Sequence, residues 1–119
     1  MPLIDIFVFS PAQTVLKCLE NIFPGYYFTK PVDNSPISHV EIGSDDDKTA
    51  MLMVEEELPG MTNVYGHLRE DWSRERLAIE LSQMVCSVVL VGNLEVSDDM
   101  ERYQEGKYTG SVKLRDMIS

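Results

Sequence analysis

The segment LIDIFVFSPAQTVLKCLENIF, residues 3–23, decides the expected fold because it joins a strand pattern directly to a helix pattern. Residues 3–9 are apolar except for Asp5 and are rich in β-branched and aromatic side chains. A short run of this composition favours a strand with both faces largely covered. The chain is therefore expected to build its core around this strand.

A helix start follows the strand at once. Ser10 is a good N-cap, Pro11 suits the first helical position, and Gln13 can reach back toward the cap. Apolar residues then recur at helical spacing: Ala12, Val15, Leu16, Leu19, Ile22 and Phe23. Pro24-Gly25 is expected to end this helix.

Later segments continue the alternation of strands and helices. Residues 37–43 and 49–57 predict a β-hairpin, and residues 58–70 predict a long loop. A helix capped by Asp71 or Ser73 then leads into a strand at residues 88–91. This β-α-β-β-α-β order predicts a ferredoxin-like split β-α-β sandwich, and another two-layer α+β sandwich is the alternative.

The length of 119 residues predicts a single α+β domain spanning residues 1–119. Residues 1–97 are its expected core, and residues 98–119 are expected to add a C-terminal hairpin around Glu105-Gly106-Lys107 or a tail. A brief extended run at Tyr26, Tyr27 and Phe28 is a further addition to the six-element order.

The net charge of −10, from 20 acidic and 10 basic residues, restricts the possible partners. Such a surface repels phosphate backbones and anionic lipids, so direct binding to nucleic acids or membranes is not expected. It favours a basic protein partner instead. Acidic charge that serves only solubility is the competing interpretation.

The N-terminus lacks the basic region of a secretory signal, and no stretch is apolar enough to span a membrane, so a cytoplasmic location is expected. Cys18 and Cys86 both fall in expected helices without a C-x-x-C spacing. They are predicted to be free, buried core residues, although their number alone also permits a disulfide.

Acidic residues cluster around the expected hairpin and again near residue 100. The hairpin tip carries Asp45, Asp46 and Asp47, and the exit of its second strand carries Glu55, Glu56 and Glu57. Asp98, Asp99 and Glu101 form the second cluster. Carboxylates fixed on strands can steer and select a basic partner, which makes these nine residues the predicted partner-binding site. A solvated turn that protects the sheet edge is the simpler interpretation of the tip.

The hairpin tip also resembles part of a calcium-binding loop. Asp45, Asp47 and Glu56 occupy the first, third and twelfth positions of that pattern, but Ala50 occupies the sixth, where glycine is needed. No metal site and no cofactor are therefore predicted.

The expected loop after the hairpin offers an alternative site. Tyr65, His67 and Trp72 could line a small-ligand site, in a regulatory domain that forms homodimers through exposed strand edges. His67 lies near carboxylates, but the sequence contains none of the serine, cysteine, phosphate-loop or zinc motifs of common enzymes. The protein is therefore not expected to be an enzyme.

Small size, strong acidity and the lack of a catalytic set are shared by bacterial immunity proteins against nuclease toxins and by protein inhibitors that imitate DNA. We therefore expect a non-enzymatic acidic protein-binding module that neutralises a basic partner. Its most concrete form is a bacterial immunity or antitoxin protein that inhibits a nuclease toxin. A small-ligand-binding or regulatory homodimeric domain is the alternative.

Overall fold

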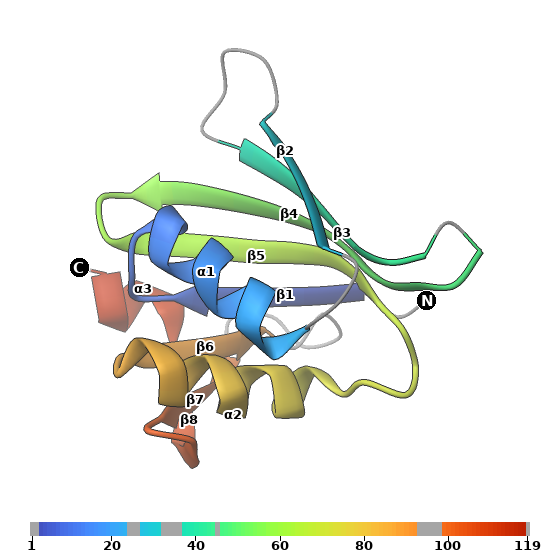
Figure 1. Cartoon of the computed structure of the whole chain (residues 1–119). Coiled ribbons are helices and arrows are strands. Elements are labelled where there is room, and N and C mark those ends of the chain that lie inside the picture. Colours follow the sequence, from blue (N-terminus) through green and yellow to red (C-terminus); the bar gives the residue numbers. More distant parts are fainter. Residues whose placement is uncertain (1–2, 24–26, 32–36, 45, 93–98, 119) are drawn as a thin grey trace.

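A computed structural model of the protein describes residues 3–23, 27–31, 37–44, 46–92 and 99–118. These residues form an eight-stranded sheet in the order β2-β3-β4-β5-β1-β6-β7-β8, and every pair of neighbouring strands is antiparallel (Figure 1). The elements in chain order are β1 (Leu3–Val8), α1 (Ala12–Ile22), β2 (Tyr27–Pro31), β3 (Ile37–Gly43), β4 (Lys48–Leu58), β5 (Met61–Leu68), α2 (Arg74–Val85), β6 (Val88–Gly92), β7 (Asp99–Gln104), β8 (Lys107–Lys113) and α3 (Leu114–Ile118).

Two helices cover one face of this sheet. Figure 1 shows α1 and α2 together in front of the strands. Alternate residues of β1, β3, β4, β5 and β6 point toward these helices, and in β1 these are Ile4, Ile6 and Val8, all buried. They pack with Leu19 of α1 and Leu81 of α2, both fully buried, so the main core lies between the helices and the sheet. The expected two-layer α+β class is confirmed.

The sheet contains more strands than the expected β-α-β-β-α-β order. The predicted loop at residues 58–70 is wrong, because β4 turns at Pro59-Gly60 and returns as β5. β5 lies between β4 and β1 and pairs with both. The C-terminal hairpin is confirmed as β7 and β8, which extend the same sheet beyond β6, and α3 follows it.

The predicted cap of α1 is also wrong. Pro11 occupies the N-cap position without a side-chain hydrogen bond, and the buried Ser10 uses its carbonyl oxygen to accept a bond from the Thr62 hydroxyl. The cap of α2 is confirmed at Ser73, whose Oγ accepts the N–H of Arg76 at 3.0 Å.

The cysteines differ in their environments. Cys18 is buried in α1, as expected, and burial raises the pKa of its thiol. Cys86 is exposed at the C-cap of α2, in the left-handed conformation, so its prediction as a buried core residue is wrong. Both cysteines are free.

The second face of the sheet is only partly covered. Met117 of α3 packs near one end of it, against a small apolar cluster that includes Phe7, Leu90 and Met100. No described helix covers the face over β3, β4, the second half of β5 and the first half of β1, and we call this region the open face. Among the described residues, no helix has the length and apolar character needed to cross a membrane.

Candidate binding site

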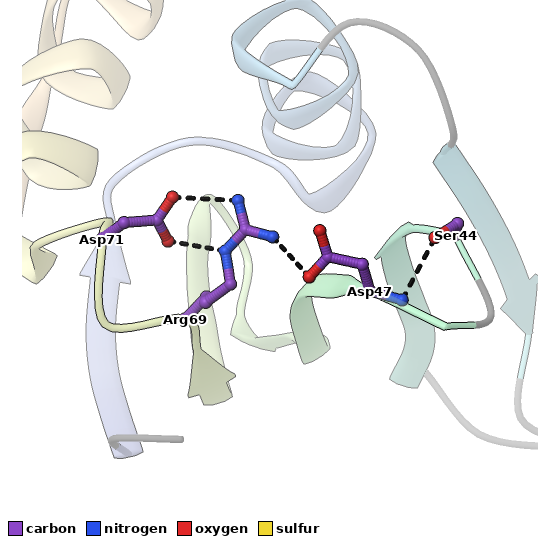
Figure 2. A network of polar contacts seen from close by, with 4 residues as sticks. All are labelled: Ser44, Asp47, Arg69 and Asp71. Carbon is purple, nitrogen blue, oxygen red and sulfur yellow. Dashed lines mark hydrogen bonds and ion pairs between the residues drawn. The ribbon is translucent and has the colours of Figure 1, made fainter.

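The tip of the β3–β4 hairpin holds two of the predicted acidic residues in the described chain, Asp46 and Asp47, while Asp45 lies outside the described residues. Asp47 is not available as a free charge, because its carboxylate pairs with the Arg69 guanidinium at 2.7 Å. The Asp47 backbone N–H donates to the Ser44 hydroxyl at 3.1 Å. Figure 2 shows Arg69 lying between Asp47 and Asp71.

Asp71 completes this network from the segment before α2. Arg69 donates to both of its carboxylate oxygens, at 2.6 and 2.9 Å. These hydrogen bonds lower the pKa of Asp71, and the two carboxylates raise the pKa of Arg69. The tip is therefore an internal ion-pair network that ties the hairpin to the start of α2, with Asp46 exposed beside it.

The other predicted hairpin acids lie at the far end of β4. Asp47 and Glu55 are eight positions apart along an extended chain, which corresponds to roughly 26 Å at about 3.3 Å per residue. The tip and exit acids therefore do not form one surface.

Glu56 points to the helix side of the sheet and is used within the fold. Its Oε1 accepts the N–H of Ala12 at 2.7 Å, and its Oε2 accepts the N–H of Gly60 at 3.3 Å. Through these two hydrogen bonds, Glu56 holds the start of α1 and the β4–β5 turn. It therefore differs from Glu55 and Glu57, which lie on the other face of the sheet.

Glu55 and Glu57 lie on the open face with a third carboxylate, Asp5 of β1. Burial raises the pKa of Glu57, and the charges of Glu55 and Asp5 raise it further. Asp5 accepts a hydrogen bond from the amide of the buried Asn63 at 2.7 Å, which fixes the position of its carboxylate. We call Asp5, Glu55 and Glu57 the acidic trio.

Asp5 was not among the residues predicted from sequence. The available signal was a single acidic residue within an otherwise apolar strand, which marks a position turned away from the core. Its proximity to Glu55 and Glu57 depends on β5, since Asp5 pairs with Tyr65 and Glu55 pairs with Asn63 on that strand.

Apolar side chains share the open face with the acidic trio. His67 of β5 pairs in register with Leu3 on one side and Met51 on the other, and these two are 55% and 39% exposed. In the next row, Tyr65 lies between Asp5 and the half-buried Met53. Burial and the charges of Glu55 and Glu57 raise the pKa of Tyr65. The open face thus combines exposed apolar side chains with carboxylates.

The three residues of the predicted ligand loop do not come together. Tyr65 and His67 lie on β5 and point to the open face. Trp72 lies on the helix side, where its ring is 4.5 Å from that of Phe23 and the Arg76 guanidinium stacks 3.7 Å above it. The sheet separates Trp72 from the other two.

The second predicted acidic cluster lies only partly within the described residues. Asp98 lies outside the described residues, and Asp99 pairs with Lys113 at 3.6 Å. Glu101 lies on the helix side of β7, at a pocket of about 310 Å³. The residues lining this pocket are Arg74, Glu75, Val91, Gly92, Glu101, Tyr103 and Tyr108.

Within the described chain, no three His, Cys, Asp or Glu side chains are grouped so as to hold a metal ion. Compared with known protein families, curated proteins and solved structures, the chain gives no match. The class defined by the structure is therefore a general one, a two-layer α+β protein whose antiparallel sheet has one partly uncovered face.

Proposed function

We propose that the protein is a non-enzymatic binding module that docks a basic protein partner on its open face. The observation that carries the proposal is the acidic trio on the same face of the sheet as the exposed Leu3 and Met51. None of the three carboxylates forms an ion pair with another described residue. A cation from a partner would supply the missing countercharge.

Two kinds of interaction would contribute to such a contact. Burial of the exposed apolar side chains favours association by roughly 25 cal/mol per Å² of apolar surface. The carboxylates would accelerate the encounter and select a partner of opposite charge. Because Glu57 is held beside Glu55 and Asp5, a bound cation would also relieve the repulsion within the trio.

A second copy of this chain fits the open face less well. Docking two open faces together would bring two acidic trios into one interface, in molecules that each carry a net charge of −10. Like charges brought together in this way disfavour association. The charge therefore favours a basic partner over a homodimer formed through this face.

The most specific form of the proposal is an immunity or antitoxin protein that blocks a nuclease toxin. A nuclease has a basic surface because it must bind phosphate groups, and an acidic face can occupy that surface. The net charge of −10 and the acidic trio support this form.

We also infer that the centre of the fold is a split β-α-β unit of the ferredoxin-like kind. The strand order β4-β5-β1-β6, with α1 following β1 and α2 joining β5 to β6, supports this inference. The strands β2 and β3 would then be an insertion, and β7 and β8 an extension. In this arrangement β4, β5 and β1 belong to the split unit, and β3 of the insertion completes the open face.

An NMR titration with a synthetic peptide of alternating lysine and leucine residues tests the proposed surface. We expect amide shifts on β4, β5 and the first half of β1, and weaker binding at high salt because ions screen exposed charges. Shifts confined to the hairpin tip, or binding that is unaffected by salt, would contradict docking on the open face.

A further inference from the structure

A pocket on the opposite side of the sheet has a composition of its own. It lies between the start of α2 and the strands β6, β7 and β8, and its volume is about 310 Å³. This is at the lower end of the range of about 300 to 1,000 Å³ that small-molecule pockets occupy. The pocket could hold a group the size of an amino-acid side chain.

Arg74, the only basic residue among the described residues that line the pocket, already has partners. Its Nε lies 3.2 Å from a carboxylate oxygen of Glu75, and its Nη1 donates to the carbonyl oxygen of Gly92 at 3.4 Å. Its charge is therefore balanced by Glu75 at the rim of the pocket.

Glu101 lacks a comparable partner. Its carboxylate accepts a hydrogen bond from the Ser111 hydroxyl at 3.4 Å, and it forms no ion pair within the described chain. The described part of the lining thus has two carboxylates and one guanidinium. The negative charge also acts on Tyr103, whose pKa is raised first by burial and then by Glu75 and Glu101.

Two tyrosine rings form another part of the pocket wall. The centroids of Tyr103 and Tyr108 are 5.6 Å apart in an edge-to-face arrangement, and Tyr108 is 55% exposed. The face of an aromatic ring attracts cations, and planar guanidinium groups stack on it well. A carboxylate and ring faces in one pocket are complementary to an organic cation.

We propose that this pocket binds a guanidinium or ammonium group, with the Glu101 carboxylate as its ion-pair partner and Tyr108 as its stacking surface. The site is independent of the proposed docking surface, because the two lie on opposite faces of the sheet. The cation can belong to a free small molecule or to an arginine side chain of a peptide, and both present the same chemistry.

Calorimetric and NMR titrations with Nα-acetyl-L-argininamide test the proposal, with Nα-acetyl-L-citrullinamide as the neutral analogue of the same shape. We expect saturable binding of argininamide only, with amide shifts at Gly92, Glu101 and Tyr108. Glu101→Gln should weaken binding about tenfold, because a hydrogen bond to a charged group is replaced by a neutral one. Glu105→Gln, an equal charge change in the exposed β7–β8 turn, serves as the matched control and should leave the affinity unchanged.

A parallel titration with the blocked peptide Gly-Gly-Arg-Gly-Gly distinguishes the two sources of the cation. At least tenfold tighter binding of the peptide would identify a protein segment as the ligand, and equal or weaker binding would identify a small molecule. The proposal is overturned if neither probe binds, if citrullinamide binds as well as argininamide, or if inorganic phosphate produces the same shifts instead. Circular dichroism of each variant checks that the fold is retained.

Discussion

The Glu56 carboxylate of β4 accepts the backbone N–H of Ala12 at 2.7 Å, although 44 positions separate the two residues in the chain. Its other oxygen accepts the N–H of Gly60 in the turn that follows β4. One side chain thus fixes both the start of α1 and the β4–β5 turn. This contact supplies the cap that Ser10 was expected to provide.

Replacing Glu56 should therefore destabilise the protein. Glu56→Ala leaves the N–H groups of Ala12 and Gly60 without their acceptor, and we expect a loss of about 1 to 2 kcal/mol in the free energy of unfolding. Denaturant unfolding measures this loss. Glu20→Ala, an exposed change within α1, should shift it by no more than about 0.5 kcal/mol. Equal stability of the two variants would contradict the capping role.

The pKa of Asp71 should depend on Arg69. Hydrogen bonds from the Arg69 guanidinium lower this pKa in the folded state. The pair should therefore stabilise the fold at neutral pH, and the contribution should be lost as the pH falls through the lowered pKa of Asp71. In an NMR titration of the side-chain carboxyl carbon, Arg69→Gln should raise the Asp71 pKa toward the ordinary aspartate range. An unchanged value would show that the ion pair does not persist in solution.

The pKa of Glu57 is shifted in the opposite direction to that of Asp71, so its contribution to stability should have the opposite pH dependence. Its folded-state pKa is raised, so its contribution to stability should fall as the pH rises from the ordinary glutamate range through the raised value. Glu55→Gln removes one neighbouring charge and should lower the Glu57 pKa, although burial, the largest cause, will keep it above the ordinary value. If NMR titration finds the same Glu57 pKa in both proteins, the acidic trio is not a coupled group.

Local patterns predicted several elements correctly. The apolar run around Ile6 and the helical spacing through Leu19 gave β1 and α1, and Ser73 gave the start of α2. The C-terminal hairpin followed from Glu105-Gly106, where both residues adopt the positive φ angles that a tight turn requires. Each of these signals lies within a few neighbouring residues.

The strand β5 escaped prediction because two of its residues are poor strand formers. Asn63 is buried, and its side chain bonds to Asp5 and to the carbonyl oxygen of Ile6. Gly66 has a φ of +141°, and a Cβ there would collide with the backbone carbonyl oxygen of Met51. Both residues suit this strand because of partners on β1 and β4, which cannot be read from the local sequence.

The candidate site could be predicted only in part for the same reason. Glu55 and Glu57 were predicted as partner-binding acids, and Asp5 joins them only through the sheet order. Glu56 was grouped with its neighbours, although the alternation of a strand turns it to the other face.

The most direct test of the central claim compares two triple variants with equal changes in charge. Asp5→Asn, Glu55→Gln and Glu57→Gln together neutralise the acidic trio. Glu20→Gln, Glu70→Gln and Glu105→Gln neutralise three exposed acids elsewhere. Calorimetry with the lysine–leucine peptide at low salt measures the affinity of each. If the open face docks basic partners, neutralising the trio should weaken binding about tenfold or more, and the control variant should stay within about threefold of the parent protein. Equal losses in the two variants would show that only net charge matters, and would contradict a docking site on the open face.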